Sequence, residues 1–63
     1  MPFYVVFHKD QQIRVFPHEI LGDDWKRARF LAIAMAEKAE QNGYHYTVEH
    51  FDGISGVGVT IWK

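Results

Sequence analysis

Short runs of apolar residues near the start of the chain predict two strands joined by a tight turn. Residues 3–8 (FYVVFH) and 12–16 (QIRVF) each have the length and the β-branched and aromatic content of a strand. The polar residues 9–11 between them are few enough for a hairpin turn. Because Pro17 has no N–H to donate to a sheet, we expect the second strand to end there.

A single helix is predicted over about residues 24–42. This segment is rich in Ala, Glu, Lys, Arg, Leu and Met, which all favour helices. Asp23 precedes it and is expected to act as the N-cap, its carboxylate accepting from the free N–H groups of the first turn. Gly43 is expected to end the helix because glycine adopts the left-handed conformation without a steric penalty.

A second pair of strands is predicted after the helix, over residues 44–51 and 57–62, with residues 52–56 as the loop between them. The order of elements is therefore ββαββ. A single helix can cover one face of a four-stranded antiparallel sheet, so we expect an α+β fold in the form of a two-layer sandwich. The length of 63 residues allows one compact domain spanning residues 1–63.

The predicted helix has two apolar faces, because residues about 100° apart around its axis separate into two groups. One face is the expected contact with the sheet. It comprises Trp25, Ala28, Leu31, Ala32, Met35, Ala36 and Ala39. Phe30, Ile33 and Ala34 lie on the opposite side, where they form either an incidental exposed patch or a contact surface.

The charges that flank the second helix face favour its interpretation as a contact surface over that of an incidental patch. The basic residues lie in the first half of the helix and the acidic ones towards its end, which opposes the helix dipole but suits an antiparallel copy of the same helix. A two-fold axis near Ile33 pairs Lys26 with Glu40. We therefore expect a homodimer through a surface made of Lys26, Arg29, Phe30, Ile33, Ala34, Glu37 and Glu40.

The face of the sheet away from the helix is expected to be aromatic. If Phe3, Val5 and Phe7 point to the helix, the other face carries a set of aromatic residues with one arginine: Tyr4, Arg14, Phe16, Phe51 and Trp62. Aromatic surfaces with little charge are typical of protein interfaces, so this set is the expected partner-binding site. The alternative is single-stranded nucleic-acid binding, in which aromatic rings stack on bases, although few cations lie on this face.

Composition narrows the classes of protein that fit. Hydrophobic residues make up 48% of the chain and the net charge is -1, which disfavours both a disordered segment and a strongly basic nucleic-acid binder. No cysteine is present, so disulfides and thiolate zinc sites are excluded, in keeping with a cytoplasmic location. No apolar stretch approaches the length of a membrane span, and no membrane partner is expected.

Residues with catalytic or metal-binding potential do not form a recognisable set. His8, His18, His45 and His50 lack the spacing of a metal site. His50, Asp52 and Ser55 are the residue types of a hydrolytic triad, but they lie within one short hairpin, where Asp52 and Ser55 suit a turn better. Gly53, Gly56 and Gly58 match no phosphate-binding motif. We therefore expect no catalytic residues, no metal, no cofactor and no enzymatic activity.

The sequence thus favours a small protein that works by binding another macromolecule. A domain near this size buries only about 60% of its unfolded surface and gains from association. In size and composition the chain is analogous to accessory proteins of phages and mobile elements that inhibit or redirect a host machine. The hypothesis is a non-catalytic protein-binding module of that accessory or inhibitor type, whose partner the sequence does not identify.

Overall fold

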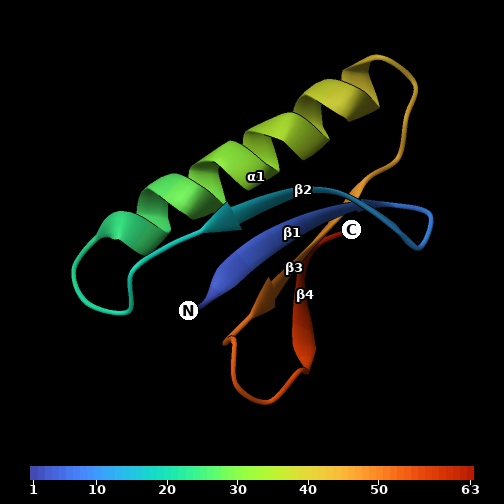
Figure 1. Cartoon of the computed structure of the whole chain (residues 1–63). Coiled ribbons are helices and arrows are strands. Elements are labelled where there is room, and N and C mark those ends of the chain that lie inside the picture. The colour runs from blue at the N-terminus through green and yellow to red at the C-terminus, as the bar shows by residue number, and fades with distance from the viewer.

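The computed structural model describes residues 1–63 and has the predicted order of elements (Figure 1). The elements are β1 (Phe3–His8), β2 (Gln11–Pro17), α1 (Asp24–Gln41), β3 (Thr47–Phe51) and β4 (Gly58–Trp62). The strands form one antiparallel sheet in the order β2-β1-β3-β4, and α1 packs on one face of it. The α+β, ββαββ prediction is confirmed. β3 is shorter than expected because residues 44–46 lead into it without pairing.

The two ends of α1 lie where the sequence predicts, but the N-terminal cap differs. Asp23 precedes the helix, and its side chain makes no capping hydrogen bond. Its backbone angles (φ -101°, ψ 6°) are outside the extended region in which an N-cap carboxylate normally reaches back to the first turn. The Asp23 carboxylate instead lies 3.7 Å from the Lys26 ammonium. At the other end Gly43 adopts φ +86°, as expected for a glycine that ends a helix.

The core lies between α1 and the sheet and is built from small helix residues. Ala28, Ala32 and Ala36 pack against Val6 and Val48, and all five side chains are buried. Alanine on the contact face lets the helix approach the strands closely, so little space is left for larger groups. The contacts of α1 fall on β2, β1 and β3, whereas β4 lies at the edge of the sheet (Figure 1). α1 does not combine the length and the apolar character that a membrane-spanning helix needs.

The faces of β1 are the reverse of those expected. Tyr4 and Val6 point to α1 and belong to the core, while Phe3 lies on the other face, where its ring stacks on Phe51 with centroids 5.3 Å apart. The prediction that Phe3, Val5 and Phe7 face the helix is therefore wrong. Residues 3–7 are all apolar, so their alternation does not distinguish the two faces.

Candidate functional site

Most of the predicted partner-binding residues lie on the helix side of the sheet. Tyr4 is only 5% exposed, and Phe16 and Trp62 are partly buried against the same core cluster. The guanidinium of Arg14 lies 5.2 Å from the centre of the Phe16 ring, on that side too. Only Phe51 lies on the uncovered face. The grouping of Tyr4, Arg14, Phe16 and Trp62 on one face is right, but the open face is not the one they occupy.

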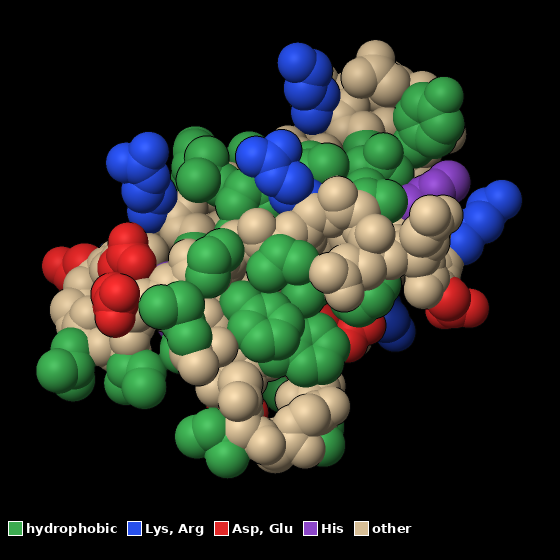
Figure 2. Space-filling view, in the orientation of Figure 1, with side chains coloured by type: hydrophobic (Ala, Val, Ile, Leu, Met, Phe, Trp, Pro, Cys, Tyr) green, Lys and Arg blue, Asp and Glu red, His purple; other side chains and the backbone are tan.

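The open sheet face is apolar nonetheless, with a different set of residues. Strand register places Phe3 beside Phe51 and Val5 beside Val15, and alternation adds Phe7. Val5 is buried beneath its neighbours on this side, so the surface itself consists of Phe3, Phe7, Val15 and Phe51, which we call the open sheet face. Figure 2 shows hydrophobic side chains gathered over the strands. Among the strand residues that share this side of the sheet, Glu49 is the one that carries a charge.

Gly58 keeps part of the open sheet face flat. A Cβ at this position would lie 2.7 Å from the Cζ of Phe51 and 2.5 Å from a carboxylate oxygen of Glu49. Any side chain here would therefore push Phe51 away from its stack on Phe3. Because Gly58 has no side chain, the Phe51 ring can lie close to the backbone of β4.

The predicted self-association residues form a stripe on the outside of α1. Phe30 is 69% exposed, while Ile33 and Ala34 are half-buried. A shallow hollow of about 400 Å³ is lined by both apolar and charged side chains of this stripe, and Ala34 does not line it. The lining residues are Trp25, Lys26, Arg29, Phe30, Ile33 and Glu37. The structure thus brings most of the predicted set together on one exposed surface.

A pair of histidines that the sequence did not single out is joined across the molecule. His18, which is buried, follows β2, and His50 lies in β3. Their Nε2 atoms are 2.9 Å apart and their ring centroids 5.2 Å apart, which means that the rings meet end to end. Tyr4 lies against both rings, with centroid distances of 5.4 Å and 4.5 Å.

The hydrogen bonds of the pair determine where its protons lie. His18 Nδ1 is 2.8 Å from the carbonyl oxygen of Glu19, which can only accept, so Nδ1 carries a proton. In neutral His18 the Nε2 atom is then an acceptor, and His50 Nε2 donates to it. Burial, and secondly His18, lower the pKa of His50, while Asp52 acts in the opposite direction.

Tyr4 is affected by the same burial. Loss of solvent raises the pKa of its hydroxyl above the ordinary value, and the positive charge of Arg29 partly offsets this. Tyr4 therefore stays neutral at physiological pH, as a residue packed in a core should. Its ring contacts with the two histidines make it part of the structural framework rather than of an exposed binding surface.

Asp52 and Ser55 form a turn. One Asp52 carboxylate oxygen accepts from the backbone N–H groups of Ile54 (2.8 Å) and Ser55 (2.9 Å), and these bonds lower the pKa of the carboxyl. The Ser55 hydroxyl donates to the same carboxylate at 3.2 Å. With the Nε2 atom of His50 bonded to His18, no relay runs from histidine to serine.

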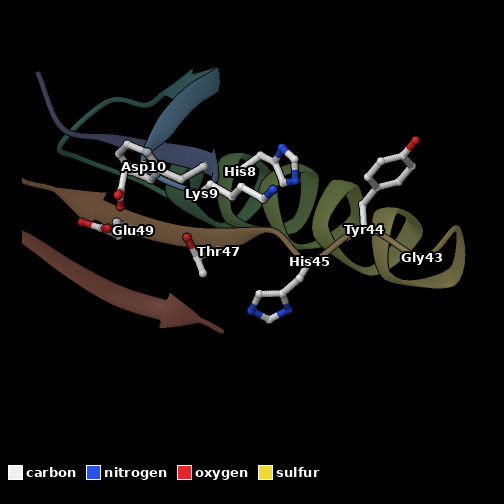
Figure 3. A pocket seen from close by; sticks show the side chains of 9 residues that line it. His8, Lys9, Asp10, Gly43, Tyr44, His45, Thr47 and Glu49 are labelled. Atoms are coloured by element: carbon white, nitrogen blue, oxygen red, sulfur yellow. The ribbon is translucent and has the colours of Figure 1, made fainter.

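The largest hollow, of about 690 Å³, lies at the end of the sheet near the β1–β2 turn. Its polar side chains come from both sides of the strands: in Figure 3, His8 and Tyr44 point to one side and His45 to the other. No three His, Asp or Glu residues of the chain are close enough together to hold a metal ion. The hollow thus presents separate polar groups rather than a converging set.

Three features of the structure can therefore bind or respond: the open sheet face, the outer stripe of α1 and the His18–His50 pair. The first two are apolar surfaces on opposite sides of the molecule, and the third is a partly buried hydrogen bond. Comparison with protein-family models, with curated proteins and with solved structures finds no match to this chain.

Proposed function

We propose that this protein is a non-catalytic protein-binding module that docks onto a partner protein through the open sheet face. The observation that carries the proposal is a strand surface that the helix does not cover, on which Val15 is exposed and Phe3, Phe7 and Phe51 are half-buried, beside a single carboxylate. Interface cores are enriched in aromatic residues and poor in charge, and contiguous exposed apolar patches mark interaction sites. Phe3 and Phe51, already stacked on each other, supply a rigid anchor for a partner surface.

Single-stranded nucleic acid is the alternative ligand, and the geometry favours it less. Binding to nucleic acid needs cations that follow the phosphates next to aromatic rings that stack on bases. Arg14, the cation expected beside the aromatic residues, lies on the helix side, and Glu49 lies among the phenylalanines instead. A negative charge at that place repels a phosphate backbone.

Within this proposal the protein acts as an accessory or inhibitor protein in the cytoplasm. A small rigid module with a flat apolar face suits the role of covering a site on a larger assembly. The fold contains no cysteine, so it does not depend on an oxidising compartment.

Replacing Val15 with aspartate is expected to weaken partner binding at least tenfold. The substitution places a charge on the open sheet face, where docking would leave it buried and unpaired. Val15 is 38% exposed on an edge strand, so we expect the free protein to keep its fold. The measurement compares proteins captured from the native cell by the wild type and by Val15→Asp, with competition by untagged wild-type protein.

The matched control is Leu31→Asp, since Leu31 is 39% exposed but lies on α1, away from the open sheet face. It should retain the partner that Val15→Asp loses. Equal capture by both variants contradicts the proposal. Salt-sensitive retention of the wild type on single-stranded DNA or RNA, lost in Arg14→Glu, would point to the nucleic-acid alternative.

The outer stripe of α1 supports a second part of the proposal, a homodimer. The stripe combines the exposed Phe30 ring with bases at one end and acids at the other, which makes it complementary to its own antiparallel copy. An axis near Ile33 brings Arg29 opposite Glu37 of the second copy. The apolar centre and the charged ends then match at the same time.

Ile33→Asp is expected to convert a dimer into a monomer, because it buries a carboxylate at the centre of the seam. Sedimentation equilibrium should show twice the mass of the chain for the wild type and a single mass for the variant. Arg29→Glu should also weaken the dimer, and adding Glu37→Arg should restore it by reversing both partners of the pair. An unchanged mass in Ile33→Asp, or a monomeric wild type, contradicts the homodimer.

A further inference from the structure

The strand β4 lies at an edge of the sheet, where one side of its backbone has no neighbouring strand. The sheet order places β3 beside it and no strand beyond it (Figure 1). The N–H and C=O groups on the outer side of an edge strand are a template for pairing with another extended segment. Because only a strand offers donors and acceptors at the same spacing, the edge itself determines the shape of its ligand.

The two edges of the sheet differ in their protection against such pairing. β2, at the other edge, carries the charged Arg14 and ends at Pro17, and both residue types discourage the addition of a further strand. β4 contains neither a charged residue nor a proline, and three of its five residues are β-branched, which favours pairing. β4 is therefore the edge that is open to strand addition.

The helix leaves apolar side chains of β4 uncovered. α1 packs on β1, β2 and β3. Val59 pairs with His50, whose ring contacts Tyr4, so Val59 lies on the helix side of the sheet, and yet it is 63% exposed. Val57, just before β4, is 68% exposed. A fifth strand with aliphatic residues at alternate positions would cover these valines.

The other side of β4 carries an unpaired carboxylate. Glu49 pairs with Thr60 across the strands, and its carboxylate lies against Gly58, in the place that a side chain of residue 58 would occupy. Glu49 forms no ion pair, because the single ion pair of the structure joins Lys26 to Asp23. A lysine or arginine on an added strand would meet this carboxylate beside Gly58.

The remaining charges around Glu49 offset one another or lie further away. Lys9 and Asp10 line the same hollow as Glu49 and carry opposite charges. The N-terminal ammonium lies against the β3–β4 loop, whose own charge is the carboxylate of Asp52. Lys63 follows the far end of β4. Glu49 is therefore the uncompensated charge beside this part of the edge.

We infer that β4 binds an extended segment of a partner protein as a fifth strand of the sheet, with alternate aliphatic residues over Val57 and Val59 and a lysine or arginine beside Glu49. The backbone of the segment pairs with the free edge, and its side chains alternate between the two sides of the sheet. This binding surface is the edge of the sheet, and it does not depend on docking to the open sheet face.

A second copy of this chain fits the edge less well than a basic strand does. Antiparallel pairing of two β4 strands around Val59 would place Gly58 of one copy roughly 8 Å from Gly58 of the other, by the spacing of residues within and between strands. Each Gly58 has a Glu49 carboxylate against it, so two like charges would come together on the same side of the sheet. A segment with a basic residue at this place removes the repulsion.

The test uses fluorescently labelled peptides in which valine alternates with lysine. In fluorescence anisotropy the full chain should bind this peptide at least tenfold more tightly than a valine–glutamate peptide of the same pattern. The valine–lysine peptide with methylated backbone nitrogens keeps its side chains but loses its N–H donors, and it should bind at least tenfold more weakly. Amide hydrogen exchange of residues 58–62 should slow when the peptide is added, while that of β2 stays the same.

Three variants assign the binding to β4. Val59→Ser should weaken it about tenfold, because one aliphatic contact is lost, and the exposure of Val59 lets the variant fold. Val15→Ser makes the same change on the opposite edge strand and should bind as the wild type does. Glu49→Gln keeps the shape of the side chain without its charge, so it should bind the lysine and glutamate peptides with similar affinity.

Other results contradict the inference. Equal binding of the valine–lysine peptide and its methylated form, or unchanged exchange at β4, shows that no strand is added there. Equal affinity of the wild type for the lysine and glutamate peptides removes the basic residue from the ligand. Loss of binding in Val15→Ser assigns the peptide to the side of the sheet that Val15 occupies. Exchange at β4 that slows with protein concentration alone makes a second copy the fifth strand.

Discussion

Replacing Tyr4 with alanine is expected to lower the free energy of unfolding by about 3–4 kcal/mol, as large aromatic-to-alanine changes in cores do. Tyr4 is buried against Val6 and the alanines of α1, and its ring contacts both His18 and His50. In a 63-residue domain this loss approaches the whole stability of the fold. Urea denaturation followed by circular dichroism measures it.

Two further variants separate the core role of Tyr4 from a general effect of losing an aromatic residue. Tyr4→Phe keeps the ring and should cost less than about 1 kcal/mol. Phe51→Ala removes a half-buried ring on the open sheet face and should cost less than Tyr4→Ala. If Tyr4→Ala is nearly neutral while Phe51→Ala is severe, the faces of the sheet are opposite to those described.

The elements of this fold could be predicted because each has a local signal. The length of the apolar runs, the helix-forming composition of residues 24–41 and the glycine at position 43 lie within the segments that they determine. The helix stripe followed in part from its period: Ala28, Ala32, Ala36 and Ala39 are buried as expected, whereas Trp25 and Leu31 of the same stripe are exposed. These features need no knowledge of distant parts of the chain.

The faces of the sheet could not be predicted, because they depend on pairing between distant residues. The register of β1 with β2 shifts after Val6, and that of β3 with β4 shifts after Val48. Each irregularity changes which side chains share a face, so Ile61 and Trp62 both reach the core. The sequence predicted that the uncovered face of the sheet is aromatic, but of the residues expected there only Phe51 lies on that face.

The histidine pair escaped notice for the same reason. His18 and His50 are 32 positions apart, and no spacing rule connects them. One sign could have helped: a histidine directly after Pro17, at the row where all four strands begin or end, is well placed to meet a residue of the neighbouring strands. The His18–His50 hydrogen bond links the segment that follows β2 to β3.

Mild acid is expected to destabilise the fold through His50, because the folded state holds the pKa of this imidazole below its ordinary value. The folded structure disfavours a positive charge on His50, because its ring is partly removed from solvent and lies beside His18. The pKa of His50 is lowered in the folded state, so the unfolded state binds more protons below the ordinary value of 6.5. Stability therefore falls as the pH drops below that value.

Urea denaturation between about pH 7 and pH 5 tests this expectation, in a range above the titration of Asp52, whose pKa is lowered from 3.8. His50→Gln is the matched variant, because its amide can still donate to His18 Nε2 but takes up no proton. Its stability should change less than that of the wild type over the same range. The Asp52 carboxylate acts in the opposite direction, because its negative charge raises the pKa of His50 and so reduces the loss of stability in acid. Parallel curves for the two proteins would mean that the acid sensitivity arises from groups other than His50.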